Sequence, residues 1–402
     1  MESINEVRIE NKALKDLGHK ALQGSIRENA FAFMIARQLF QKQKQDDNFV
    51  FSPFSLWLTL AALVNAVKPE YVPELLAELK AEGIRTSQLN DHVSTLLFSL
   101  LGEANKAYIK DFVPSLRITN ALFVSQAETI RPDFAQIFAQ NYQGTAFQVD
   151  FFSPKAAKAI NDWARKHTEG LIDHLVDGFD QDTVAAIANA IYFSDHWSRE
   201  FKESDTKPGV FHSINGDMQV AYMCKEANDF NYYEDESVQA VSLAYNQGGS
   251  MWILLAKNES VRELYQRLSE DDFKQIETQS KPSCGKLLLP RFSATNHHNL
   301  NSVLSSLNIP LFDRKAAVLK GGLICDDKPV WLSAAMQQAV IQVDEKGTTA
   351  GAVTLIMMAG SALHLPGEPF VMHCDKPFVF LLQKQSRILF SGIINKPSPV
   401  SK

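Results

Sequence analysis

The chain has 402 residues, of which 45% are hydrophobic and 21% are charged, so it can bury a large core as a globular protein. Its net charge of −6 at pH 7, without basic blocks or interleaved basic and aromatic residues, argues against a nucleic-acid partner. The most apolar run, residues 50–67, contains polar residues and is shorter than the roughly 20 residues that span a membrane, so we expect a buried helix and no membrane partner.

The first half of the chain mixes helices and strands. Apolar residues at helical spacing predict a helix over residues 26–41, and the Ser-Pro pair at 52–53 begins a second, more apolar helix. Residues 117–125 are typical of a strand. Further helices are expected at 132–142 and 156–167, the last one closing at Glu169-Gly170.

The second half is rich in short strands, several of them apolar on both faces. The expected strands lie in 185–193, 237–245, 251–256, 286–292, 337–343, 378–383 and 387–394. No repeat or linker divides the chain, so we expect one α+β domain over residues 26–397. An N-terminal extension, residues 1–25, is expected to be helical or partly disordered, and residues 398–402 form a C-terminal tail.

Enzyme signatures are absent from the sequence. It contains no G-x-S-x-G, no phosphate-binding loop, no G-x-G-x-x-G after a strand and no H-E-x-x-H. A triad assembled from distant positions is recognised only in space, and nothing here nominates one, so we name no catalytic residue. Asp150, His196 and His373 are interpreted as ordinary core or surface positions.

Metal and cofactor sites are not expected either. The cysteines lie too far apart for a zinc spacing or a disulfide framework, and we expect free thiols at Cys224, Cys284, Cys325 and Cys374. His297 and His298 are adjacent, so they point in different directions on a regular element and lack a second ligand pair nearby.

The N-terminus, MESINEVRIENKALKD, lacks the basic and apolar pattern of a secretory signal. We therefore expect a cytoplasmic or non-classically secreted protein, or an extracellular one if a leader has been trimmed.

One segment near the C-terminus has an unusual composition. Between Gly347 and Asp375 it carries neither lysine nor arginine, and it begins with a run of very small side chains before becoming apolar. Strong strand formers follow Gly347, so the residues from Thr348 to Met358 are compatible with either a loop or a strand.

Eight motifs, in order along nearly the whole chain, resemble the serpin family of protease inhibitors. They are NFVFSPFSL (48–56), ITNALFV (118–124), INDWARKHTEGLI (160–172), ANAIYFSDHW (188–197), LPRF (289–292), VDEKGTTAGA (343–352), KPFVFLL (376–382) and LFSGIINKP (389–397). The resemblance implies a metastable fold with one large mixed sheet, two smaller sheets, about nine helices and an exposed reactive-centre loop over about residues 345–375.

The same resemblance implies a function. A target protease attacks the loop and forms an acyl-enzyme, and the cleaved loop enters the large sheet as a new strand and distorts the protease, so the inhibitor is consumed. Such a protein is a monomeric inhibitor and not an enzyme. Non-inhibitory relatives carry bulky, charged or proline residues in the hinge, whereas here Gly351 and Val353 are only mild departures.

The hinge of the reactive loop is implied by the family pattern at Glu345, Gly347, Thr348, Ala350 and Ala352. Gly347 permits the backbone to rotate, and Thr348, Ala350 and Ala352 alternate so that all three would face the core after insertion. The hinge composition is therefore of the inhibitory type.

Counting the family's usual spacing from Glu345 places the scissile bond at Ser361-Ala362. The stretch that follows is about five residues longer than in common members, which leaves Met358, Leu363, His364 and Leu365 as alternatives. Without Lys or Arg in the loop, trypsin-like targets are disfavoured. Elastase-like and subtilisin-like serine proteases are favoured, then chymotrypsin-like ones, with papain-like cysteine proteases as a further alternative.

The family pattern also implies two supporting groups. A polar cluster under the large sheet, called the shutter, corresponds to Ser52, Ser55 and Asn189, with Gln337 in place of the usual histidine. Glu345 and Arg291 match an ion pair near Trp197 where the loop would begin to insert, a region called the breach.

The sequence departs from the family pattern in two features. The usual glycine-rich turn after the second helix is replaced by VNAVKPEYVPE, and no basic helix resembles a heparin site. A non-inhibitory serpin that acts as a binding or chaperone-like protein, and a hydrolase with an unrecognised triad, are the alternative functions.

Overall fold

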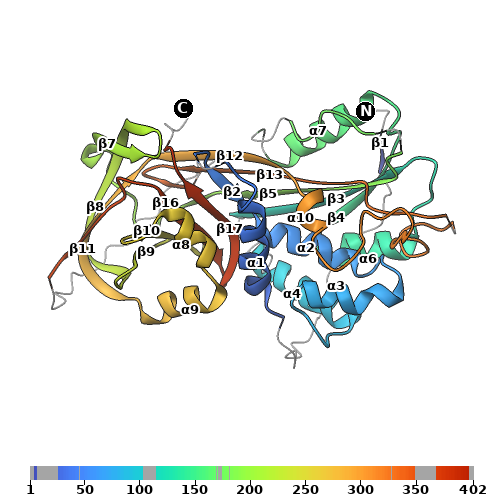
Figure 1. Ribbon diagram of the computed structural model, residues 1–402, viewed down its shortest axis with the longest axis horizontal. Coiled ribbons are helices and arrows are strands. Elements are labelled where there is room, and N and C mark those ends of the chain that lie inside the picture. The colour runs from blue at the N-terminus through green and yellow to red at the C-terminus, as the bar shows by residue number, and fades with distance from the viewer. Residues whose placement is uncertain are drawn as a thin grey trace. The chain divides into compact units, whose positions relative to one another are not determined.

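A computed structural model describes residues 4–6, 26–44, 46–102, 115–168, 170, 174–180, 182–326, 328–348 and 368–397 (Figure 1). Within these ranges it contains nine α-helices and two β-sheets, which confirms the α+β class. The helices are α1 Glu28–Phe40, α2 Pro53–Leu63, α3 Val72–Glu78, α4 Thr86–Leu100, α6 Pro132–Tyr142, α7 Lys155–His167, α8 Val261–Arg267, α9 Glu270–Gln279 and α10 Asn301–Leu304. Two 3-10 turns, η1 Pro69–Tyr71 and η2 Glu203–Asp205, accompany them.

Among the described residues, the first sheet has eight strands and is mixed, as expected. Its order is β1-β4-β3-β5-β13-β14-β6, with β12 paired to β13. The pairs β3 with β4 and β5 with β13 are parallel, whereas β13 with β14 and β14 with β6 are antiparallel. The strands are β1 Ile4–Glu6, β3 Leu116–Ser125, β4 Gly144–Val149, β5 Ala185–Phe193, β6 Asp195–His196, β12 Phe292–Asn299, β13 Ala334–Val343 and β14 Gly347–Thr348.

The second sheet has nine strands in the order β15-β11-β8-β9-β10-β16-β17-β2, with β7 paired to β8. The strands are β2 Phe49–Phe51, β7 Lys207–Ser213, β8 Gly216–Glu234, β9 Val238–Ala244, β10 Ser250–Ala256, β11 Lys281–Pro290, β15 Phe370–His373, β16 Phe378–Lys384 and β17 Arg387–Ile394. The two smaller sheets expected from the resemblance are joined here, because the 19-residue β8 pairs with β7 and β11 along most of its length and with β9 at its end.

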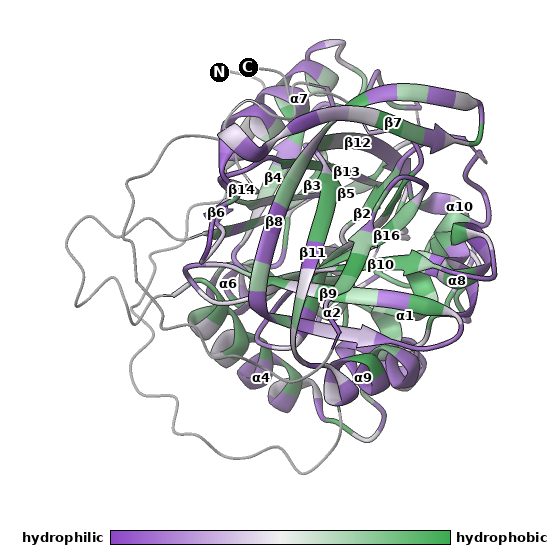
Figure 2. Ribbon diagram, turned by 90° about the vertical axis from the view of Figure 1, so that its left-hand side faces the viewer, coloured by the Kyte–Doolittle hydropathy of each residue, from purple (hydrophilic) through white to green (hydrophobic). Residues whose placement is uncertain are grey.

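Burial along these strands follows their hydrophobic pattern. All residues of β5 are buried, and β16 is buried at six of its seven positions, as expected for strands that are apolar on both faces. The long β8 alternates between exposed, half-buried and buried residues, and its colours alternate in Figure 2.

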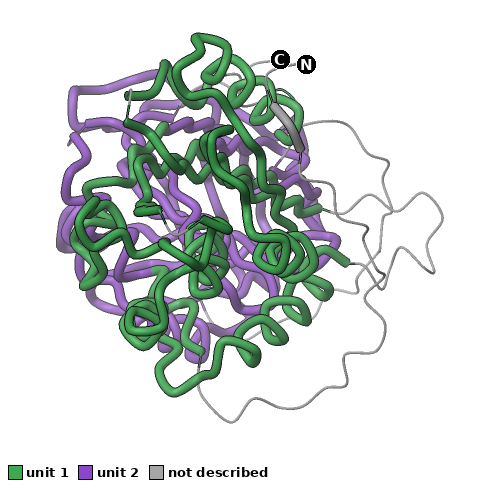
Figure 3. Tube along the Cα trace, turned by 90° about the vertical axis from the view of Figure 1, so that its right-hand side faces the viewer, with its two compact units in different colours: residues 1–32, 54–192, 297–339 green, residues 33–53, 193–296, 340–402 purple. Residues whose placement is uncertain are grey.

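The chain folds into two compact units, each built from separate stretches of sequence (Figure 3). Unit 1 consists of residues 1–32, 54–192 and 297–339, and unit 2 of residues 33–53, 193–296 and 340–402. The interpretation of residues 26–397 as one domain stays a prediction. Of the N-terminal extension the structure describes Ile4–Glu6, which form a strand antiparallel to β4.

Proline residues lie at the boundaries of two expected elements. The run 286–292, expected as one strand, belongs to β11 up to Pro290 and to β12 from Phe292 onward. Between them the N–H of Arg291 bonds to the carbonyl of Ala221 on β8 (2.9 Å). The helix predicted to begin at the Ser-Pro pair does start at Pro53, because proline fits the first turn of a helix, and the residues before it form β2.

Short amphipathic helices were not anticipated from the sequence. The helices α8 and α9 each begin with a capping box, in which the side chain of Ser260 or Ser269 accepts a hydrogen bond from the N–H three residues later. In the stretch VNAVKPEYVPE, which replaces the family's glycine-rich turn, η1 leads directly into α3. Within the described ranges, no helix has the length and apolar character needed to cross a membrane.

Candidate functional site

A buried polar network lies in unit 1 between α2 and the first sheet. The Gln337 side-chain amide donates to Ser55 Oγ (3.0 Å), and Ser55 Oγ in turn donates to the side-chain carbonyl of Asn189. The Asn189 amide donates to Asn120 Oδ1. The structure thus brings together three of the four predicted shutter residues.

Asn120 and Thr59 extend this network beyond the residues that the sequence nominated. Asn120 donates to the carbonyl of Tyr142 (2.7 Å), and Thr59 Oγ1 lies 3.2 Å from Asn120 Oδ1. Both side chains are buried. The only sequence pattern that points to them is a polar residue at an inward-facing position of an apolar run. Ordinary polar core positions show the same pattern.

Ser52 is the fourth predicted shutter residue. It is fully buried in unit 2, where its hydroxyl donates to the carbonyl of Leu389 on β17 (2.7 Å).

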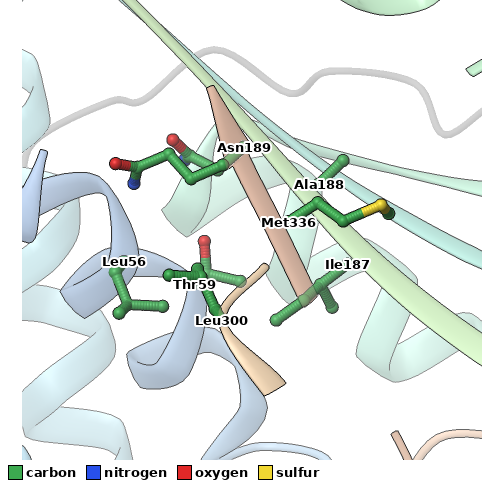
Figure 4. Close-up of a pocket in the computed structure, with 8 residues that line it drawn as sticks. Leu56, Thr59, Ile187, Ala188, Asn189, Leu300 and Met336 are labelled. Carbon is green, nitrogen blue, oxygen red and sulfur yellow. The ribbon is translucent and has the colours of Figure 1, made fainter. Parts of the chain in front are cut away.

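The network lies where two parallel strands cease to pair. The pairing of β5 with β13 runs from Ala186↔Ala334 to Asn189↔Gln337 and ends there. Two polar side chains of the network therefore occupy the last paired position, and the strands are not bonded to each other beyond it. A small pocket adjoins this position, with walls from α2, β5, β13 and Leu300 (Figure 4).

In unit 2, a partly buried ion pair fixes the turn that follows β13. Arg291 Nη2 lies 2.6 Å from Glu345 Oε1, and its Nε lies 2.9 Å from both carboxylate oxygens, while Thr206 Oγ1 donates to the same carboxylate. The Glu345 side chain is 5% exposed and that of Arg291 is 36% exposed. Arg291 and Thr206 thus hold the turn through the carboxylate of Glu345.

Trp197 holds the same turn through the backbone. Its indole N–H donates to the carbonyl of Asp344 (3.0 Å), and its backbone N–H donates to the carbonyl of Lys346 (2.8 Å). The N–H of Phe201 donates to the carbonyl of Glu345 (2.9 Å). Consecutive carbonyls of the turn are thereby satisfied, which leaves little freedom at its base.

Protonation of Glu345 should weaken this part of the molecule. Burial by itself raises the pKa of Glu345, but the hydrogen bonds from Arg291 and Thr206 outweigh it and lower the pKa below the ordinary 4.5. A lowered pKa in the folded state means that the interaction stabilises the protein above about pH 4.5, and that this stability is lost as the pH falls through the folded-state pKa.

We expect Glu345→Gln to reduce the free energy of unfolding at pH 7 by about 1 to 2 kcal/mol, because it removes the charge that pairs with Arg291. The partial exposure of Arg291 keeps this loss below that of a fully buried pair. The difference between parent and variant should shrink below about pH 4.5. Urea titrations from pH 7 to pH 3.5 measure it. In an Arg291→Met background the substitution should show little pH dependence, and an undiminished difference there would contradict the assignment to this ion pair.

The hinge begins as a strand. Gly347 and Thr348 form β14, which pairs with β13 through Val343↔Thr348 and with β6 through Gly347↔His196 and Thr348↔Asp195. A Cβ at Gly347 would lie 2.2 Å from the carbonyl oxygen of Asp195, so this backbone approach requires glycine.

Thr348 is 3% exposed, and its hydroxyl lies 2.6 Å from the hydroxyl of Tyr245. Tyr245 is buried and stacks on Trp197 with ring centroids 4.5 Å apart. A residue expected to be buried only after insertion is therefore already buried. Sequence reasoning missed Tyr245, because nothing local connects it with Thr348, about a hundred positions away.

The rest of the predicted loop lies outside the described residues. This applies to the hinge positions Ala350 and Ala352 and to the predicted scissile bond with its alternatives, namely Met358, Ser361, Ala362, Leu363, His364 and Leu365. Chain description resumes at Glu368, and β15 then pairs in parallel with β11. Among the described residues, no cluster of three or more His, Cys, Asp or Glu side chains is arranged to hold a metal ion.

Comparison with protein-family models decides the family. The model described as Serpin (serine protease inhibitor) matches residues 27–397, nearly the whole chain. The chain belongs to the serpin family. The fold class and the large mixed sheet expected from the resemblance are confirmed, and the described part of the chain contains nine helices, as expected.

Curated relatives agree with this serpin assignment. An uncharacterised serpin-like protein of Thermococcus kodakarensis is 28% identical over 374 residues, which are 92% of this chain and 84% of that protein. The alpha-1-antiproteinase of Rattus norvegicus is 28% identical over 371 residues, 91% of this chain and 87% of that one.

Solved structures share the serpin fold. The native state of Tengpin, a thermophilic serpin, superposes with a TM-score of 0.80 at 23% identity and covers 94% of this chain and 96% of its own. Human thyroxine-binding globulin in complex with thyroxine gives a TM-score of 0.79 at 22% identity, with 92% and 97% covered. Since that protein is named for the small molecule it binds, the shared fold does not by itself specify protease inhibition.

Proposed function

We propose that this serpin is a suicide-substrate inhibitor of serine proteases that works by reactive-loop cleavage, acyl-enzyme trapping and insertion of the loop into the first sheet. The observation that carries the proposal is the hinge. Two of its residues, Gly347 and Thr348, already pair as a strand between β13 and β6. The residues that follow have very small side chains, which hinder entry of the chain into a sheet less than bulky or charged ones would.

In the proposed reaction, the protease serine oxygen attacks the carbonyl carbon of the residue before the scissile bond, which we place at Ser361. The bond to the nitrogen of Ala362 breaks, this nitrogen takes the proton that the serine loses, and an ester joins the protease to Ser361. Insertion of the cleaved loop before water hydrolyses this ester is what would trap the protease.

The energy for distortion would come from new strand pairing. The stretch from Thr348 to Ser361 reaches roughly 45 Å when extended, at about 3.3 Å per residue. If each new ladder hydrogen bond contributes about 0.5 to 1.5 kcal/mol, insertion releases on the order of 10 kcal/mol before packing is counted. The end of β5–β13 pairing at Asn189↔Gln337 supports this part of the sheet as the place of opening.

The composition of the loop supports a class of target. Because no Lys or Arg lies between Gly347 and Asp375, a specificity pocket with a buried acid finds no partner there. Small and apolar residues around Ser361 suit elastase-like or subtilisin-like proteases, then chymotrypsin-like ones. Papain-like cysteine proteases are a further target class, since their nucleophile attacks the same carbonyl.

Incubation with elastase, subtilisin, chymotrypsin and trypsin tests the proposal. We expect a covalent complex that survives SDS with at least one of the first three, and none with trypsin. Mass spectrometry should find residues 362–402 as the released fragment. Clean cleavage by every protease in the panel, without any complex, would refute inhibition.

A binding function is the second candidate, because thyroxine-binding globulin with its ligand shares this fold. The two functions differ after cleavage of the loop. An inhibitor that inserts its loop should unfold at a much higher temperature after cleavage, whereas a serpin that does not insert should show no large rise.

A further inference from the structure

The strand that receives the hinge carries a buried carboxylic acid. Asp195, the first residue of β6, is 4% exposed and forms a cross-strand pair with Thr348. Its Oδ2 accepts a hydrogen bond from the backbone N–H of Gln247 (2.9 Å). The proposed inhibitory reaction assigns no task to this side chain.

The hinge contributes to the burial of Asp195. Directly opposite residues of an antiparallel pair place their side chains on the same face, with Cβ atoms about 5 Å apart. Thr348 therefore lies beside the Asp195 carboxyl, and the hydroxyl of Tyr245 bonds to Thr348 on that face. If β14 left the sheet, the carboxyl would lose this neighbour and gain water.

Three titratable side chains surround Asp195. Lys384 at the end of β16 is 7% exposed and its charge acts on the carboxyl, as the charge of the adjacent His196 does. Tyr245 is the third, and the charge of Asp195 acts on its hydroxyl. His196 bonds to Glu200 through Nδ1 (3.0 Å), while its buried Nε2 has no partner among the described residues.

Burial is the largest influence on this carboxyl, and it raises the pKa of Asp195 to about 6. The Gln247 N–H and the Lys384 charge favour the carboxylate but do not compensate for the burial. Burial likewise lowers the pKa of Lys384, which the charge of Asp195 partly restores. With the hinge withdrawn, the solvated carboxyl should return toward its ordinary value near 3.8.

We propose that Asp195 is a proton-operated latch for the hinge, which holds β14 in the sheet when the carboxyl is protonated and releases it more readily when the carboxyl is ionised. The direction follows from linkage, since the state that binds the proton more tightly gains population as the pH falls. The inference rests on the proposed function, because seating of the hinge is the first step of loop insertion.

The size of the effect follows from the two protonation equilibria. If the pKa of Asp195 is about 6 with the hinge seated and 3.8 with it withdrawn, the ratio of seated to withdrawn molecules rises roughly tenfold between pH 7.5 and pH 5.0. The backbone N–H groups of Trp197 and Asp344 report this ratio, because they donate to the carbonyls of Lys346 and Gly347 in the hinge turn.

Hydrogen exchange of these two amides, corrected for the intrinsic effect of pH, tests the latch without any protease. In the parent protein we expect their protection to rise roughly tenfold from pH 7.5 to pH 5.0. Asp195→Asn, which is neutral and nearly isosteric, should be protected about equally at both values. If Asp195→Asn keeps the response of the parent, or if protection falls on acidification, the latch does not exist.

Two further variants separate the latch from other titrating groups. Lys384→Met removes the charge that favours the carboxylate, so the rise in protection should begin at a higher pH than in the parent. His196→Gln should retain the rise, and its loss would assign the response to His196 instead. Because no protease enters these measurements, failure of the latch and failure of inhibition remain separate results.

Discussion

Thr348→Arg is expected to convert the protein from an inhibitor into a substrate of the same proteases. The side chain at this position is 3% exposed and lies against the hydroxyl of Tyr245, so arginine can seat there only by burying its charge or by pushing β14 out of the sheet. Asp195 lies across the strand pair, but its carboxyl is itself buried, and burial of a charge beside it still costs several kcal/mol. Since about 1.4 kcal/mol changes a ratio tenfold, cleavage without trapping should exceed trapping by more than tenfold.

The measurement is the fraction of protease held in covalent complex, together with the number of inhibitor molecules consumed per protease. Thr348→Ser is the matched control, because it keeps a small side chain and the hydroxyl that meets Tyr245. Thr348→Glu should be at least as severe as Thr348→Arg, since the Asp195 carboxyl opposite can pair with arginine but not with glutamate. Equal complex yields for parent and Thr348→Arg would count against insertion as the mechanism.

Asn189→Leu is expected to destabilise the native state by about 3 kcal/mol. Asn189 accepts from Ser55 and donates to Asn120, and both partners are fully buried. Leucine would remove the acceptor of the Ser55 hydroxyl and the amide donor to Asn120, and each loss in this buried network costs about 1 to 3 kcal/mol. Because Asn189 sits in the last pair between β5 and β13, the variant should also insert its own loop more readily without cleavage.

Equilibrium or kinetic unfolding in urea measures the first effect, and loss of inhibitory activity on mild warming measures the second. Asn231→Leu is the matched control, since it makes the same substitution at an exposed strand position on β8 and should change stability by less than about 0.5 kcal/mol. Similar losses for both variants would show that Asn189 acts only through general strand propensity.

Elements with a strong local pattern could be predicted from the sequence. The apolar runs that became β5, β10, β16 and β17 are long, continuous and β-branched or aromatic, so their hydrophobicity alone selects a buried strand. Elements with weaker patterns were missed. Helices α8 and α9 are short and polar, and β8 alternates irregularly because different partners cover its two ends.

The residues of the candidate site also fall into two groups, those that the sequence predicted and those that it did not. Ser55, Asn189, Gln337, Arg291 and Glu345 were nominated through family motifs, and the structure gives their contacts. Asn120, Thr206, Tyr245 and Asp195 were not nominated. Each is defined by a partner far away in the chain, and a single sequence carries no record of such pairs.

By itself, the sequence determined the family, the α+β class, the positions of the main strands and the absence of basic residues from the loop, because motifs, hydrophobic periodicity and composition are local properties. Only the tertiary structure decided that the hinge already begins as a strand, that Gly347 is required by the carbonyl of Asp195, and that a carboxylic acid lies buried beside Thr348. These facts depend on which distant backbones approach each other, and burial and electrostatics arise only from that approach.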